Sequence, residues 1–71
     1  MPRYAVAVCN TDEDNEVRIV EAENELKAMV LAVGMEEAWG IKNGEIPFQT
    51  VDEGITFYIQ GDTAVSKPVE I

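Results

Sequence analysis

Alternation of large and small side chains predicts a β-hairpin at the start of the chain. Residues 4–9 alternate large apolar residues with small ones, the two-residue period of a half-buried strand, so the first strand is expected at residues 3–9. A cluster of polar turn residues follows at residues 10–15, and apolar alternation resumes with Val17 and Ile19. We therefore expect two strands joined by a polar turn.

A helix is predicted to begin at Glu25. Asn24 is a favourable N-cap because its side-chain oxygen can accept a hydrogen bond from a first-turn amide, and Glu25 then lies at the positive end of the helix dipole. An apolar stripe with three- and four-residue spacing follows and consists of Leu26, Met29, Val30 and Val33. This stripe breaks at Gly34, which we interpret as a C-cap or a kink.

Two interpretations are open for the residues after Gly34. In the first, Met35 and Trp39 form a separate apolar pair on a short second turn that ends at Gly40. In the second, a straight helix continues through Ala38. The buried or exposed position of Trp39 depends on this choice.

The C-terminal half shows three further alternating segments, which we interpret as strands. The first spans residues 46–51, where Pro47 suits a strand start or an edge, and the second spans residues 55–60 and has the clearest alternation in the chain. A turn at Gly61 and Asp62 leads to a last strand at residues 63–67, after which Pro68 ends the pairing and the tail frays.

The predicted order is therefore β-β-α-β-β-β. Large residues on one sheet face would meet the apolar stripe of the helix. We predict a single α+β domain over residues 1–71, with two layers: an antiparallel sheet and one helix packed on one face.

Cysteine use and hydropathy predict a cytoplasmic protein. Cys9 is the only cysteine among 71 residues, so no intrachain disulfide can form. The longest nearly apolar stretch, residues 28–35, is far shorter than the roughly 18 to 20 residues that cross a bilayer. We expect no contact with a membrane.

The chain offers little catalytic chemistry. It contains no histidine, which removes Ser-His and Cys-His nucleophile pairs, and one thiol without imidazoles cannot fill a tetrahedral zinc site. Asp12, Asp14 and Glu16 are spaced like the first ligands of a calcium loop, but Val17 occupies the position that requires glycine. We predict neither an enzyme nor a cofactor or metal site, and we interpret Cys9 as a small packed residue.

Acidic residues carry the strongest functional signal. Fourteen Asp and Glu against five Lys and Arg give a net charge of −9, which disfavours direct binding to nucleic acid. Within residues 12–16 and 21–25 the acids fall at two-residue intervals, so an extended chain would place carboxylates roughly 7 Å apart on one side. The candidate partner-binding residues are Asp12, Glu13, Asp14, Glu16, Glu21, Glu23 and Glu25. A solvated face that keeps the protein soluble is the alternative.

The stretch from Val17 to Ala28, after the first strand and an acidic turn, resembles small phage-encoded inhibitors of the T7-type RNA polymerase inhibitor family. The resemblance covers residues 4–33 and implies a hairpin, an acidic run into a helix and a return strand. Members of that family block the host polymerase by occupying its basic DNA channel, and some anti-CRISPR proteins share this size, acidity and layout. Residues 46–67 have no counterpart in the polymerase inhibitor, so only the acids are carried over.

Two hypotheses of function follow. In the first, the protein is an inhibitor or modulator, of phage type or a DNA mimic, whose acids cover the basic nucleic-acid-binding surface of a partner protein in the host cytoplasm. In the second, it is a small structural protein that forms a homodimer or larger oligomer by pairing edge strands or its small-residue face. Trp39 and Tyr58 are either core residues or exposed binding anchors.

Overall fold

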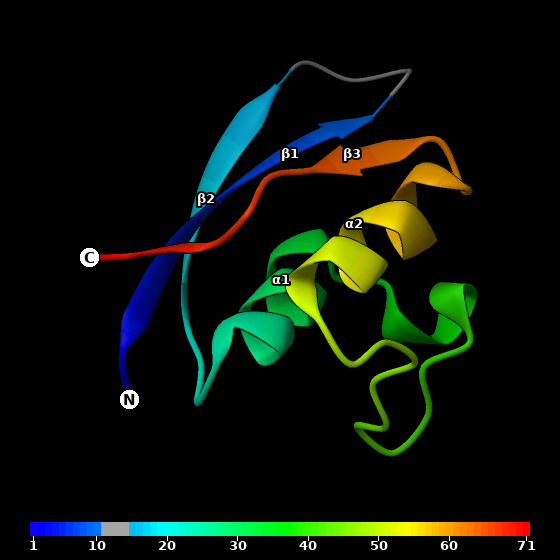
Figure 1. Ribbon diagram of the computed structural model, residues 1–71, viewed down its shortest axis with the longest axis horizontal. Helices are drawn as coiled ribbons and strands as arrows, with labels where there is room; N and C mark the ends of the chain where they lie inside the picture. The colour runs from blue at the N-terminus through cyan, green and yellow to red at the C-terminus, as the bar shows by residue number, and fades with distance from the viewer. Residues whose placement is uncertain (11–14) are drawn as a thin grey trace.

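A four-stranded antiparallel sheet carries all the helices on one of its faces (Figure 1). The computed structural model describes residues 1–10 and 15–71. The elements in chain order are β1 (Arg3–Asn10), β2 (Glu16–Glu21), α1 (Glu25–Val33), η1 (Glu36–Trp39), α2 (Val51–Ile59), β3 (Thr63–Val65) and β4 (Val69–Glu70). The α+β class, with an antiparallel sheet and helical packing on one face, is confirmed.

The central strand is β1, which pairs antiparallel with all three of the other strands, β2, β3 and β4. Register runs from Arg3 opposite Glu21 to Val8 opposite Glu16, which confirms the predicted pairing of the first two strands. The turn between them was predicted at residues 10–15, of which residues 11–14 lie outside the described residues and Asn10 is the last residue of β1. The large residues of β1 face the helices and are buried, whereas its small residues face away.

Both predicted ends of α1 are confirmed. The Asn24 Oδ1 atom accepts a hydrogen bond from the Lys27 amide at 2.9 Å. At the other end, Gly34 has φ 72° and its N–H donates to the Val30 carbonyl at 3.0 Å. The apolar stripe faces the sheet, with Met29 fully buried.

The short second turn is also confirmed. The 3-10 helix η1 ends at Trp39 and is capped by Gly40, whose φ is 77°. The alternative of a straight helix through Ala38 is wrong, because Gly34 and Met35 both have positive φ, which no right-handed helix contains. Trp39 packs against the core, whereas Met35 is 68% exposed.

The predicted strand at residues 55–60 is wrong, because α2 occupies this segment. The N-cap is Thr50, whose Oγ1 accepts a hydrogen bond from the Glu53 amide at 3.1 Å. Glu53 Oε2 in turn accepts from the Gln49 amide at 2.9 Å. This reciprocal cap satisfies two main-chain donors at the helix start, and it outweighs the strand-like alternation that follows.

The predicted strand at residues 46–51 is wrong as well, since residues 46–50 lead irregularly into α2.

The C-terminal end of the chain also differs from the predicted single strand and frayed tail. The strand expected at residues 63–67 stops at Val65, and the tail does not fray: β4 pairs with β1, and the Ile71 N–H donates to the Arg3 carbonyl at 2.9 Å.

The core between the two layers is built on aromatic contacts. Tyr58 is fully buried, and its ring packs edge-on against those of Trp39 and Phe57, with centroids 4.9 and 5.2 Å apart. Phe48 packs on the same cluster, 5.8 Å from Tyr58. Tyr58 is therefore a core residue, and Trp39 is a partly buried one.

Candidate functional site

The four predicted partner-binding acids that the structure describes do not form a single row. Asp12, Glu13 and Asp14 lie outside the described residues. Of the remaining four, Glu16 and Glu21 open and close β2 and project from opposite faces of the sheet, because they are five residues apart. The expected line of carboxylates on one side is therefore wrong for the described part of β2.

Two of these acids pair with the few cations of the chain. Arg18 Nη2 lies 3.0 Å from Glu16 Oε2, and Lys27 Nζ lies 3.4 Å from Glu23 Oε2. The carboxylates of Glu16 and Glu23 are 61 and 62% exposed, so each pair contributes little stability and leaves its carboxylate open to a partner.

Glu25, the seventh predicted acid, is the first residue of α1 and is half-buried. Burial, together with the negative charges of Glu70 and Glu25, raises the pKa of the Tyr4 hydroxyl. Glu25 is thus near enough to Tyr4 for its charge to act on the tyrosine hydroxyl.

Glu21 and Glu23 border a groove beside α1, which was not predicted. The groove consists of two adjoining hollows, of about 270 and 590 Å³, that share Leu31 and Glu36 in their linings. We call this surface the α1 groove. Its acidic side chains are Glu21, Glu23, Glu36 and Glu37.

Large apolar side chains are exposed in the α1 groove. Leu31 is 50% exposed at the junction of the two hollows, and Met35 lines the wider one. Ile46 and Val30 line the narrower hollow between α1 and the following loop. Among the described lining residues Lys27 is the only cationic side chain, and Glu23 already neutralises it. The groove therefore combines apolar lining residues with four carboxylates, which we call its acidic rim: Glu21, Glu23, Glu36 and Glu37.

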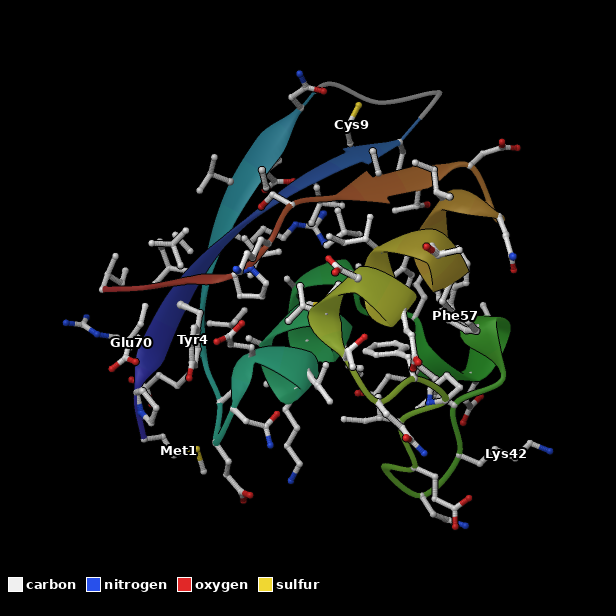
Figure 2. The ribbon with its side chains drawn as sticks, viewed as in Figure 1. Met1, Tyr4, Cys9, Lys42, Phe57 and Glu70 are labelled. Carbon is white, nitrogen blue, oxygen red and sulfur yellow. The ribbon has the colours of Figure 1, made fainter. Side chains whose placement is uncertain are left out.

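The outward face of the sheet is a second exposed apolar surface. It presents the small residues of β1 between ridges on β2 and β4, and we call it the outer sheet face. Val17, Ile19 and Val69 are 66, 55 and 59% exposed on these ridges. A hollow of about 360 Å³ is lined by Ala7 and Cys9 among others, and the Cys9 sulfur points away from the helices (Figure 2). Cys9 is half-buried there.

Burial and the charge of Glu36 raise the pKa of the Tyr58 hydroxyl to about 12. Its ring is fully enclosed, and its oxygen has no hydrogen-bond partner among the described residues.

Within the described residues, no three acidic or thiol side chains converge to hold a metal ion.

The α1 groove could not be predicted from the sequence, because the exposure of its apolar residues depends on tertiary contacts. Leu31 follows Lys27 by four residues, on the α1 face opposite the buried stripe. The four-residue spacing of Leu31 from Lys27, together with the predicted helix break at Gly34, was the sequence signal that could have indicated an exposed apolar residue here.

In the part of the chain that the structure covers, no helix has the length and apolar character needed to cross a membrane.

Comparison with protein-family models, with curated proteins and with solved structures finds no match to this chain.

Proposed function

We propose that this protein is a non-catalytic binding protein that recognises a basic surface on a partner protein in the cytoplasm. One observation carries the proposal: the α1 groove joins four carboxylates to exposed apolar side chains in a protein of net charge −9. Apolar residues at the centre of an interface supply affinity, and a charged rim supplies orientation and speed of association.

The proposed partner surface is one that otherwise binds nucleic acid, since proteins often keep such surfaces basic. Binding there would inhibit or modulate the partner, as the resemblance to phage inhibitors and anti-CRISPR proteins implies. Imitation of a regular phosphate row is not part of this proposal, because Glu16 and Glu21 project from opposite faces of β2.

The test is titration with a lysine homopeptide of about 20 residues at about 50 and 300 mM salt, where screening of exposed charges differs strongly. A groove variant replaces Glu21, Glu23, Glu36 and Glu37 with Gln. A matched control replaces Glu45, Asp52, Asp62 and Glu70, which border neither hollow, with the corresponding amides. Each variant removes four negative charges from the net −9.

We expect the groove variant to lose about tenfold in affinity at low salt and the control to lose less than about threefold. Equal losses would show that affinity follows net charge alone, and absence of binding by the unchanged protein would refute the proposal.

A second candidate function, self-assembly, is favoured by the outer sheet face. Val17, Ile19 and Val69 form exposed ridges beside a hollow, a shape that a second copy can fill by placing its own ridge there. Two copies of charge −9 repel each other, so this association should strengthen with salt. Sedimentation equilibrium at low and high salt tests it, and a monomer at every concentration and salt would exclude it.

A further inference from the structure

The two hollows of the α1 groove together have the layout of a helix-binding surface. The narrower hollow, about 270 Å³, has room for a large apolar side chain of a partner. Val30 and Ile46 give it apolar walls. It can therefore receive an apolar anchor residue.

The wider hollow continues the same surface past Leu31. Met35 and Ala38 line it, and the exposed methionine side chain can adapt to different apolar partners. Two neighbouring apolar sites match the way in which an amphipathic helix presents residues three or four positions apart.

Charge determines which helix fits. An acidic or uncharged segment would take the carboxylates of Glu21, Glu36 and Glu37 out of water without a counter-charge, which is unfavourable. A second copy of this chain and a nucleic acid are both disfavoured by the same acids. Lysine or arginine beside the apolar anchors would instead pair with the rim.

We propose that the α1 groove binds an amphipathic helical segment of the partner protein, with apolar anchors over Leu31 and flanking lysines or arginines on the acidic rim. This inference rests on the proposed function and makes it specific. The partner is recognised by a short basic helix, so the contact is more than attraction between charged surfaces.

The experiment compares two peptides of about 14 residues, or four turns of helix. One has leucine at positions spaced i, i+3, i+4 and i+7 and lysine at most others. The second has the same lysines, with serine in place of each leucine. Binding is measured by calorimetry and by amide chemical-shift changes, with the unchanged protein and with two variants.

The first variant is Leu31→Gln, and the control is Ile59→Gln. Both residues are helical, at 50 and 53% exposure, and Ile59 borders neither hollow of the α1 groove. Thermal unfolding establishes that both variants fold.

We expect the leucine-lysine peptide to bind at least about tenfold more tightly than the serine-lysine peptide, since buried apolar area adds to the charge attraction. Leu31→Gln should remove most of this preference, Ile59→Gln should not, and shift changes should centre on residues 30–38.

Equal, salt-sensitive binding of both peptides, unaffected by Leu31→Gln, would overturn the helix-binding inference while leaving the proposed function intact. Failure of both peptides to bind at low salt would overturn both.

Discussion

Arg18 on β2 donates a hydrogen bond from Nη1 to the main-chain carbonyl of Ala32 in the last turn of α1. The same nitrogen lies 3.4 Å from the carbonyl of Val33. No basic residue occurs in the last turn of α1 itself, so β2 supplies the cation that the negative end of the helix dipole favours. One side chain thereby ties the hairpin to the helix layer.

Replacement of Arg18 by Met should destabilise the protein by about 1–2 kcal/mol, because two C-terminal carbonyls lose a charged donor while the apolar stem is retained. Chemical denaturation measures the change. Glu16→Gln is the control and should cost less than about 0.5 kcal/mol, since the Glu16 carboxylate is largely exposed to solvent. If both variants cost the same, the ion pair and not the helix cap is the stabilising contact.

Gly61→Ala should displace the indole of Trp39. A Cβ built at Gly61 would approach the indole edge closely, at 2.5 Å from Cζ3, and a rigid ring cannot yield locally. We expect a loss of about 1–3 kcal/mol, typical of overpacking. The chain has one tryptophan, so its emission should also shift to the red.

The neighbouring Gln60→Ala variant, at an exposed position, should stay within about 0.5 kcal/mol and keep the emission maximum. An unchanged spectrum in Gly61→Ala would contradict the close packing of Trp39.

Tyr58 should make the protein less stable at alkaline pH. Its pKa is about 12 in the folded protein, against 10.0 for an ordinary tyrosine. Below pH 10 both states are protonated and stability is unaffected. Between pH 10 and 12 the unfolded chain loses the proton first, so stability should fall by at most about 1.4 kcal/mol per pH unit. Above pH 12 this effect levels off.

Tyr58→Phe isolates that effect from the other groups that titrate at high pH. At neutral pH the variant should be as stable as the unchanged protein, or more stable by up to about 1 kcal/mol, because the buried hydroxyl has no partner among the described residues. Urea denaturation from pH 8 to pH 12 provides the comparison. Parallel curves for the two proteins would show that the hydroxyl does not titrate in this range.

Local signals predicted the N-terminal half of the fold. The alternation around Val6, the cap at Asn24 and the break at Gly34 each depend on neighbouring residues, and all three were correct. The segment 51–59 was misassigned because Ile55, Phe57 and Ile59 alternate as in a strand.

The same segment also carries a helical stripe at Val51, Ile55 and Tyr58, and the Thr50 to Glu53 capping box was the signal that should have decided between the two. Ile59, which was predicted to lie in a strand, is instead the last residue of α2 and is 53% exposed. The two-residue strand β4 has no local pattern of its own and depends on pairing with β1.

Half of the charged part of the candidate site was predicted, since Glu36 and Glu37 were not among the predicted partner-binding residues. Glu21 and Glu23 were identified as partner-binding candidates, and both line the α1 groove. Leu31 and Met35 were not identified as site residues, because the exposure of an apolar side chain depends on how the neighbouring elements pack.

Gly54→Ala tests the contact between α2 and the rest of the core. Gly54 is buried in the middle of α2, where a Cβ would lie 2.8 Å from Phe48 Cε2 and 2.9 Å from Met29 Cε. Alanine favours the helix by about 1 kcal/mol over glycine, whereas overpacking costs about 1–3 kcal/mol. Because Phe48 is itself buried and cannot move freely, we expect a net loss of about 1 kcal/mol, measured by denaturation. In the double variant Gly54→Ala/Met29→Leu, the Met29 Cε atom is absent, so part of the loss should be recovered. A gain in stability from Gly54→Ala alone would mean that α2 packs less closely on Phe48 than the structure indicates.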